Sequence, residues 1–417
     1  MVSPPVLDAV VIGAGSAGLG VSFLLAQAGM RHRLLERGRI GETWRRQRWD
    51  SFQMNTPNWS TAIPGTPYHG GEPDGFYSRD QFVGMLEDHA SRHRLPVETA
   101  TPVLEVATGE AHGATCYHVT TPRETVLTRN VIIATGNQSR PKLPALARSL
   151  PEGPLRLHTA DYRSADALPA GDVLVVGCAT SGMQIAEDLI EAGGRAVYLA
   201  TSRVGRQARR YRGHDIVHWI EHAGIFDQPP PVADEAGHIV ARASLGARRT
   251  ISLQSLSRQG ATLLGRITSI DGDQVHFGDD LGDNIRFADE ASAAQKRFID
   301  EYILRSALEE PTAEPDPAEA VAPRLPEPPI RALDLRARGI SAVIWCTGFD
   351  GDFSWARLPG LLDSRGQPIH ERGMTVWPGV YFVGLDFQSV RRSGTVGGVA
   401  ADAQHVLAAI ARTRSLC

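Results

Sequence analysis

The sequence predicts an α/β protein with two doubly wound domains, and a strand, turn, helix and strand near the N-terminus are the first observation behind this prediction. Asp8–Gly13 is a short apolar run that ends in glycine, which is typical of a buried parallel strand. Ser16–Ala28 carries apolar residues at helical spacing and is followed by Gly29, which stops the helix. Arg33–Glu36 is the next strand. These elements make one βαβ unit.

The second observation is that the same unit occurs again, roughly 165 residues later. The repeated elements are the strand Asp172–Val176, the helix Ser181–Ala192, which Gly193 and Gly194 stop, and the strand Ala196–Ala200. Two such units at this separation indicate two doubly wound domains rather than a short-period repeat.

The third observation is a set of further apolar strands that end in glycine turns. They are Val131–Gly136, Ala342–Gly348 and Gly379–Gly384, and a helix that starts near Gly394 follows the last of them.

Ala307–Ile330 is instead rich in Pro, Glu and Ala with few large apolar residues, which predicts a linker or exposed loop. It falls where the chain would pass from the second domain back to the first. We therefore expect one domain made of residues 1–150 and 330–417, with the other domain, residues 151–329, inserted in it.

The composition narrows the class of protein. The chain has 417 residues, too many for one simple core, and 42% of them are hydrophobic, as in a soluble globular protein. A net charge of -4 gives no reason to expect a nucleic acid or an anionic membrane as partner. No stretch reaches the roughly 18 apolar residues of a membrane span, so a cytoplasmic protein is expected. The four cysteines, Cys116, Cys178, Cys346 and Cys417, form no CxxC pair, which argues against a disulfide framework, a metal site or a dithiol centre.

The turn Gly13–Gly18 reads GAGSAG and predicts a dinucleotide site of the Rossmann type. Glycines there allow a tight turn and a close approach of the backbone to a pyrophosphate, which the N-terminus of the following helix attracts. Glu36 ends the next strand and can accept hydrogen bonds from ribose hydroxyls. The alternative is a glycine-rich turn without a ligand. The residues expected to contact the dinucleotide here are Gly13, Gly15, Ser16, Ala17, Gly18 and Glu36.

The turn Gly177–Gly182 reads GCATSG and has Ala179 in place of the middle glycine. The strand after it ends in Ser202 and Arg203 without an acidic residue, so a 2′-phosphate would find a cation there rather than a repelling carboxylate. This pattern favours NADPH over NADH. The alternative is a degenerate domain that no longer binds a nucleotide. The residues expected to contact the nicotinamide cofactor are Cys178, Thr180, Ser181, Gly182, Ser202 and Arg203.

With both turns, the chain resembles the class B flavoprotein monooxygenases, the flavin-containing monooxygenases and their bacterial relatives, over nearly its whole length. Besides the two turns, the matching segments are Gly41–Arg45 (GETWR), Asn55–Trp59 (NTPNW), Gly75–Asp80 (GFYSRD), Ala134–Gly136 (ATG) and Cys346–Asp350 (CTGFD). Gly153–Tyr162 resembles the family's FxGxxxHxxxY sequence, with His158 and Tyr162 at the family spacing but Pro151 in place of the phenylalanine.

The resemblance implies FAD in the first domain, NADPH in the second and O2 as co-substrate. NADPH would reduce the flavin, and the reduced flavin would form a C4a-hydroperoxide with O2 that oxygenates a small organic substrate at nitrogen or sulfur. It implies a catalytic role for Asn55 at the edge of the flavin, with Asn58 as second candidate, whereas an Asx turn before Pro57 is the structural alternative. The further cofactor-binding residues that it implies are Arg37, Trp44, Arg45, Thr135, Gly136, Thr347, Gly348 and Leu385.

The sequence leaves several alternative functions open. Baeyer–Villiger enzymes of this class usually have tryptophan at the position of Tyr162, so ketone oxygenation is the weaker alternative. A flavin reductase without oxygenation and a non-enzymatic redox sensor are the others. By analogy His158 is structural, and a homodimer is expected. Arg209–Arg212, His214 and His218 either line the nicotinamide or substrate entrance or form a solvated basic face.

Overall fold

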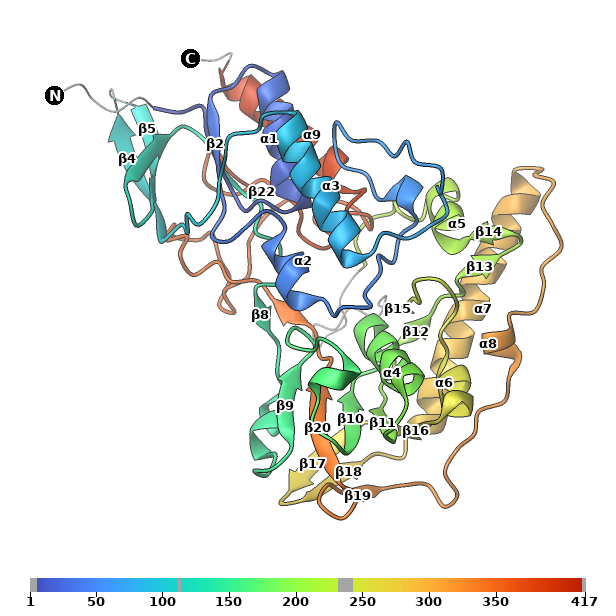
Figure 1. Ribbon diagram of the computed structural model, residues 1–417. Coiled ribbons are helices and arrows are strands. Elements are labelled where there is room, and N and C mark those ends of the chain that lie inside the picture. Colours follow the sequence, from blue (N-terminus) through green and yellow to red (C-terminus); the bar gives the residue numbers. More distant parts are fainter. Residues whose placement is uncertain (1–5, 112–113, 232–242, 415–417) are drawn as a thin grey trace.

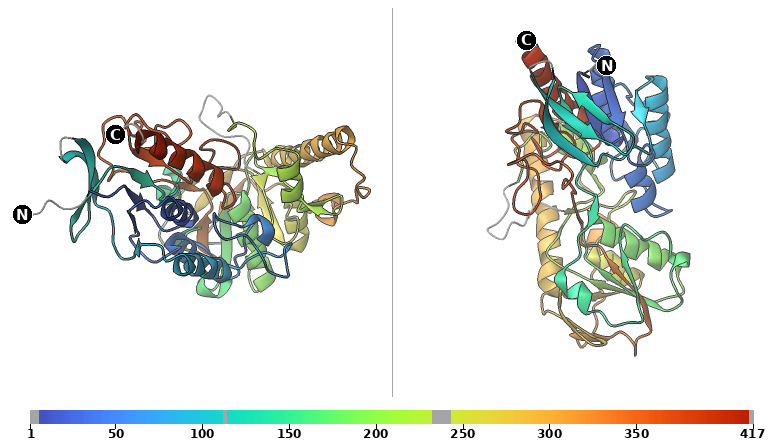
Figure 2. Two further views of the ribbon diagram at one scale, coloured as in Figure 1. Left: turned by 90° about the horizontal axis from the view of Figure 1, so that it is seen from above. Right: turned by 90° about the vertical axis from the view of Figure 1, so that its left-hand side faces the viewer.

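The computed structural model describes residues 6–111, 114–231 and 243–414, and these fold into two lobes (Figure 1). In the first lobe the helices α1 (Ser16–Gln27), α3 (Arg79–Arg92) and α9 (Val399–Arg414) run side by side. The right-hand view of Figure 2 shows one lobe above the other, with segments of the chain passing between them. None of the helices in the described part of the chain combines the length and the apolar character that a membrane span requires.

The first lobe is built on a five-stranded parallel sheet with the order β22-β7-β1-β2-β3. Its strands are β1 (Ala9–Ile12), β2 (His32–Leu35), β3 (Val97–Glu98), β7 (Val131–Ile133) and β22 (Val380–Phe382). Every residue of β1, β7 and β22 is buried, which explains why these segments read as unbroken apolar runs. A three-stranded antiparallel sheet lies beside this one and consists of β4 (Glu105–Ala111), β5 (Ala114–Thr120) and β6 (Thr125–Thr128).

The second lobe has the same architecture around a five-stranded parallel sheet with the order β16-β11-β10-β20-β9. Its strands are β9 (Leu155–His158), β10 (Asp172–Val176), β11 (Val197–Ala200), β16 (Ala261–Leu264) and β20 (Ile340–Trp345). Its helices are α4 (Thr180–Ala192), α5 (Ile216–His222), α6 (Leu253–Gln259), α7 (Leu281–Arg305) and α8 (Pro317–Ala320). The antiparallel strands β17 (Ile267–Asp271), β18 (Gln274–Phe277) and β19 (Ala332–Asp334) complete the lobe.

Short elements connect these parts. The first lobe contains α2 (Glu42–Gln47) and the 3-10 turn Asn58–Ser60. Two more 3-10 turns, Ala145–Ser149 and Ala165–Ala167, come later in the chain, on either side of β9. The two-stranded ribbons pair β8 (Arg140–Pro141) with β21 (Phe349–Asp350), β12 (Gly205–Arg206) with β15 (Ala243–Ser244), and β13 (Arg210–Tyr211) with β14 (His214–Asp215).

The expected domain boundary at residue 330 is wrong. β20 lies between β10 and β9 in the second sheet, with both neighbours parallel, although we expected residues 330–417 to belong to the first domain. The chain returns to the first lobe only at β21, which pairs with β8. An apolar run identifies a buried strand, but the sheet that it joins depends on partners far away in the sequence.

The segment Ala307–Ile330 has little regular structure, as expected, but it is fastened across the second lobe rather than free. Glu319 on α8 accepts hydrogen bonds from Arg206, at 3.0 Å, and from Lys296 and Ser292. The neighbouring cations lower the pKa of this half-enclosed carboxyl although burial opposes them. The segment therefore acts as a strap over α7.

Candidate active site

The three glycines of the first loop are needed for different structural reasons. Gly13 has φ +103°, and a Cβ there would lie 2.8 Å from the carbonyl oxygen of Ala134. A Cβ on Gly18 would lie 1.8 Å from the carbonyl oxygen of Gly13, because α1 packs that closely on the strand. A Cβ on Gly15 would meet nothing within 4 Å, and its φ of -86° suits any residue. The protein itself therefore needs Gly13 and Gly18, whereas Gly15 keeps open a space outside the protein.

Glu36 ties the first loop to the end of β2. One carboxylate oxygen accepts the backbone N–H of Ala14 at 2.7 Å, and the other accepts that of Gly38 at 2.8 Å. The side chain is 8% exposed and still lines the cavity beside the loop. Because each carboxylate oxygen has a second lone pair, Glu36 can shape the loop and accept a ligand hydroxyl at the same time.

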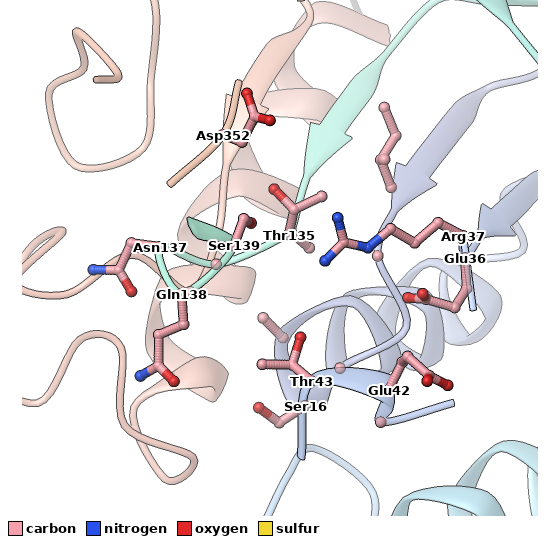
Figure 3. Close-up of a pocket in the computed structure, with 18 of the residues that line it drawn as sticks. Ser16, Glu36, Arg37, Glu42, Thr43, Thr135, Asn137, Gln138, Ser139 and Asp352 are labelled. Atoms are coloured by element: carbon pink, nitrogen blue, oxygen red, sulfur yellow. The ribbon is translucent and has the colours of Figure 1, made fainter. Parts of the chain in front are cut away.

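A cavity of about 230 Å³ opens at the carboxyl ends of β1 and β2, against the N-terminus of α1 (Figure 3). Predicted residues that line it are Gly13, Gly15, Ser16, Ala17, Glu36, Arg37, Trp44, Thr135 and Gly136. This is the place where open parallel sheets bind nucleotides, since helix N–H groups and strand ends converge there.

Five of the cofactor contacts expected in the first lobe lie outside this lining: Gly18, Arg45, Thr347, Gly348 and Leu385. Arg45 instead pairs with Glu87 and donates to the carbonyl oxygen of Ile40 at 3.1 Å. Leu385 is buried in the core, next to Gly384, which does line the cavity. Trp44 touches the cavity and also packs its ring on Phe82, with ring centroids 4.8 Å apart.

The cavity also has a polar wall whose residues were not among the expected cofactor contacts, although Glu42 and Thr43 lie in the matching segment Gly41–Arg45. It consists of Glu42, Thr43, Thr101, Asn137, Gln138, Ser139, Asp352 and Asp386. The Ser354 hydroxyl, 2.8 Å from the carboxylate of Asp352, lowers the pKa of that group, and Arg140 and Arg37 act in the same direction. Asp352 is therefore an anion at neutral pH, on the side of the cavity opposite α1 in Figure 3.

One polar atom among the predicted lining residues lacks a partner. The hydroxyl of Thr135 is buried and has no hydrogen-bond partner among the described residues. A buried hydroxyl without a partner costs about 1–3 kcal/mol, which a bound ligand would recover. Together with the open space at Gly15, this atom indicates that the cavity is shaped for a ligand.

The second loop repeats the geometry of the first. Gly177 has φ +105°, and a Cβ on Gly182 would lie 1.8 Å from the carbonyl oxygen of Gly177. Ala179 has φ -73° and ψ -178°, close to the -86° and -170° of Gly15, so its methyl group is unstrained and points into the equivalent space.

Other side chains of the second loop have partners within their lobe. The Sγ atom of Cys178 accepts the backbone N–H of Ser202 at 3.2 Å, which fastens the loop to the end of β11. The Thr180 hydroxyl accepts the backbone N–H of Leu245 at 3.2 Å. Arg203 is exposed, with its guanidinium 4.8 Å above the ring of Phe287. Ser181 and Gly182 lie in the first turn of α4.

The turn after β20 belongs to the joint between the lobes. The backbone N–H of Lys142 and the Nε2 atom of His158 both donate to the carbonyl oxygen of Gly348, at 2.9 Å each, and the Thr347 hydroxyl donates to the carbonyl oxygen of Lys142. His158 accepts the backbone N–H of Ala160 at its other ring nitrogen. Burial lowers the pKa of His158, so the ring is neutral, which fits the structural role expected for it.

Tyr162 strengthens the same joint. Its hydroxyl donates to the carboxylate of Asp188 on α4 at 2.5 Å, and Ser51 of the first lobe donates to the other oxygen of that carboxylate at 2.5 Å. Burial raises the pKa of this fully enclosed phenol, and Asp188 adds to the effect. Tyr162 is thus a neutral donor that helps to hold the two lobes together.

The two candidate asparagines have different surroundings. Asn58 is buried, and its Nδ2 atom donates to the carbonyl oxygen of Glu72 at 2.9 Å, which holds the neighbouring turn. Asn55 lies where the lobes meet, and its Oδ1 atom accepts from Nε2 of Gln184 on α4 at 2.8 Å. Neither residue lines the 230 Å³ cavity.

Comparisons with known proteins agree with this geometry. Residues 10–222 match the family model described as pyridine nucleotide-disulphide oxidoreductase. An uncharacterized CzcO-like oxidoreductase of Geobacillus kaustophilus is 31% identical over 407 residues, which cover 96% of this chain and 97% of that protein. The indole-3-pyruvate monooxygenase YUCCA1 of Oryza sativa is 30% identical over 188 residues, 45% of this chain and 46% of that protein.

Solved structures show the same fold. A flavin-containing monooxygenase from Stenotrophomonas maltophilia superimposes with a TM-score of 0.67 at 18% identity, over 98% of this chain and 99% of that chain. The ornithine N-hydroxylase of Kutzneria sp. 744, in a complex with reduced FAD, NADP+ and L-ornithine, has a TM-score of 0.62 at 15% identity, over 98% and 100%. The predicted α/β fold with two dinucleotide-type lobes is confirmed, and so is the resemblance to flavoprotein monooxygenases.

Proposed function

The chain belongs to the pyridine nucleotide-disulphide oxidoreductase family, and on that premise we propose that it is an NADPH- and O2-dependent flavin monooxygenase. The observation that carries the proposal is the pair of equivalent glycine loops, one in each lobe, of which the first opens on a polar cavity. Two nucleotide sites in one chain suit a flavin in one lobe and a hydride donor in the other. A homodimer is part of the proposal by analogy.

FAD fits the first lobe. The open space at Gly15 and the N-terminus of α1 suit a pyrophosphate, and Glu36 can accept from a ribose hydroxyl. The unpartnered Thr135 hydroxyl and the exposed Arg37 supply further donors in the same cavity. When bound, the flavin would take a hydride from NADPH and pass the electrons to O2 for transfer of one oxygen atom to a substrate.

NADPH rather than NADH suits the second lobe. The backbone N–H of Gly13 donates to the carbonyl oxygen of Leu35, and that of Gly177 donates to the carbonyl oxygen of Ala200. Leu35 and Ala200 are thus equivalent, so the residue after Ala200, Thr201, takes the place that Glu36 has in the first lobe. Thr201 is buried and donates to the carbonyl oxygen of Leu264 at 2.7 Å. Because this position carries no carboxylate, a 2′-phosphate would not be repelled. The guanidinium of Arg203, which lies over the ring of Phe287, would supply a cation for it.

Replacing Arg203 by alanine is expected to raise the KM for NADPH at least tenfold, which corresponds to about 1.4 kcal/mol. The KM for NADH should stay within roughly twofold, because NADH has no 2′-phosphate. Steady-state assays with both cofactors measure this. Arg210→Ala is the matched control, because Arg210 is also exposed and its guanidinium donates to the carbonyl oxygen of Gly213, within its own turn. Equal changes in both KM values would contradict the assignment of Arg203.

Replacing Ala179 by glycine is expected to lower the KM for NADPH about threefold, on the order of 0.7 kcal/mol. The methyl group of Ala179 occupies the space that Gly15 leaves open in the first lobe, so its removal lets a pyrophosphate approach. Glycine is well tolerated at the N-cap position that Ala179 holds. An unchanged or higher KM would show that the methyl group does not limit binding.

Disulfide reduction is less suited to this chain. The described cysteines, Cys116, Cys178 and Cys346, are all buried. Burial raises the pKa of Cys178 and raises that of Cys346 to about 12. Since the thiolate is the attacking species in thiol–disulfide exchange, these thiols are inert at neutral pH. This favours oxygenation of a small organic molecule, at nitrogen or sulfur by resemblance, over a dithiol reductase.

A single reaction series tests the proposal. NADPH is added under anaerobic conditions to the FAD-loaded protein, and we expect the flavin absorption band at about 450 nm to bleach. Oxygen is then admitted in the presence of amines, sulfides or ketones, and NADPH consumption, oxygenated product and released peroxide are measured. Oxygenated amine or sulfide is the expected product. A flavin that bleaches but yields only peroxide or reduces quinones would support a reductase, and one that does not bleach would support a redox sensor.

A further inference from the structure

Asn55 is held from the second lobe at its side chain. The Nε2 atom of Gln184 donates to Oδ1 of Asn55 at 2.8 Å and to the carbonyl oxygen of Leu245 at 3.1 Å. Gln184 lies on α4 and is only 8% exposed. The contact therefore connects the segment after α2 in the first lobe with the nucleotide-binding half of the second lobe.

This arrangement fixes the direction of both amides. The carbonyl oxygen of Leu245 can only accept, so the end of the Gln184 amide that faces it must be the NH2 group. The same NH2 group faces Asn55, so Asn55 must present its oxygen there. The Nδ2 donors of Asn55 are then turned away from Gln184, and among the described residues none accepts from them.

The backbone of Asn55 is held from the same side. Arg209 is 2% exposed, and its Nη1 atom donates to the carbonyl oxygens of Asn55 at 2.9 Å and Gly246 at 3.0 Å. Residues 245–246 thus receive hydrogen bonds from both groups that hold Asn55. Both the position of the Asn55 backbone and the direction of its amide are set by the second lobe.

The same segment also contacts the second glycine loop. The backbone N–H of Leu245 donates to the hydroxyl of Thr180, the first residue of α4, and Gln184 lies about one helical turn later. A nucleotide at the start of α4 would therefore contact the element that carries Gln184.

We propose that Gln184 is a positioning residue that presents the N–H donors of Asn55 to the flavin when NADPH or NADP+ occupies the second lobe. The inference rests on the proposed function, because it takes Asn55 as the residue at the flavin edge. In this proposal Gln184 acts through Asn55 and not on the cofactor itself. An amide donor fixed in this way can hydrogen-bond an acceptor on the flavin without a change of charge.

Two variants of Gln184 test the direction of the amide. Gln184→Glu keeps the shape but can no longer donate to Asn55, and Gln184→Leu removes the hydrogen bond altogether. For both FAD-loaded variants we expect FAD to stay bound and anaerobic reduction by NADPH to continue. The share of NADPH electrons that end as peroxide should rise about fivefold, and the change that NADP+ causes in the flavin absorption spectrum should be lost. Glu191→Gln, on the exposed side of α4, is the control and should change neither readout.

Asn55→Ala completes the test as a double-mutant cycle. If Gln184 acts through Asn55, adding Gln184→Leu to Asn55→Ala produces no further change in peroxide share or in the spectrum. Fully additive effects, or Gln184 variants that behave like wild type in both readouts, would overturn the inference. The spectrum recorded with NADP+ needs no turnover, so a wild-type protein that fails to oxygenate substrates would refute the proposed function and leave this test in place.

Discussion

Replacing Gly15 by alanine is expected to leave the protein folded and to weaken FAD binding at least a hundredfold, about 2.7 kcal/mol. A Cβ at this position meets no protein atom within 4 Å, and the φ of -86° is compatible with alanine. The methyl group would instead stand in the space where a pyrophosphate approaches the backbone. Thermal unfolding of the apoprotein and fluorescence titration with FAD separate the two effects.

Gly18→Ala is the matched comparison in the same loop. Its Cβ would lie 1.8 Å from the carbonyl oxygen of Gly13, so α1 would have to move away from β1, at a cost of about 3 kcal/mol or more. We expect this variant to unfold at a lower temperature even without FAD. A Gly15→Ala protein that binds FAD like wild type would refute the placement of FAD at this loop, whatever the behaviour of Gly18→Ala.

Local patterns in the sequence were sufficient for both glycine loops. Each one follows a buried strand and opens a helix, and each geometry depends on residues within a short stretch of chain. Five residues expected from the first loop and the strand after it consequently line one cavity: Gly13, Gly15, Ser16, Ala17 and Glu36. Four more of its lining residues, Arg37, Trp44, Thr135 and Gly136, were expected only from the family resemblance. The first loop was predictable because the spacing of its glycines records close approaches between neighbouring elements.

Contacts between distant segments were not predictable in this way. Asp352 reaches the cavity wall from a segment that follows the second lobe, and no spacing relates it to the first loop. β20 has the apolar pattern of any buried strand, so only its neighbours β9 and β10 show that it belongs to the second sheet. The sequence around Gln184 predicts only a helix residue, and its contact with Asn55 depends on how the two lobes meet.

The basic run Arg209–Arg212 shows the same limit within four residues. In the ribbon of β13 and β14, Arg210 is exposed, whereas Arg209, just before it, is 2% exposed. A solvated basic face is therefore wrong for Arg209 and correct for Arg210. The sequence has no signal that separates the two arginines, because the difference depends on Asp215, Asn55 and Gly246 closing around the first of them.

Replacing Asp215 by alanine is expected to lower the free energy of unfolding by about 3–5 kcal/mol, because it leaves the buried guanidinium of Arg209 without its counter-ion. Burial lowers the pKa of Arg209 more than Asp215 raises it. Arginine nevertheless stays charged, so the cost cannot be avoided by loss of a proton. Asp215 also accepts the backbone N–H of Val217 at the start of α5, which adds about 1 kcal/mol. Urea unfolding followed by tryptophan fluorescence measures the total.

Asp215→Asn separates these two contributions, because an amide oxygen can still accept from Val217 but carries no charge. The asparagine variant should lose most of the 3–5 kcal/mol but keep the helix cap. Its free energy of unfolding should therefore decrease by about 1 kcal/mol less than that of the alanine variant. Arg286→Ala breaks an exposed pair with Asp283 and should cost under about 1 kcal/mol. If Asp215→Ala cost no more than Arg286→Ala, Arg209 would not be a desolvated cation, and its hydrogen bond to the Asn55 backbone would not hold that residue in place. Because Arg209 and Gln184 hold different atoms of Asn55, the Asp215 variants should also raise peroxide release in proportion to their loss of stability, whereas the Gln184 variants should raise it at nearly constant stability.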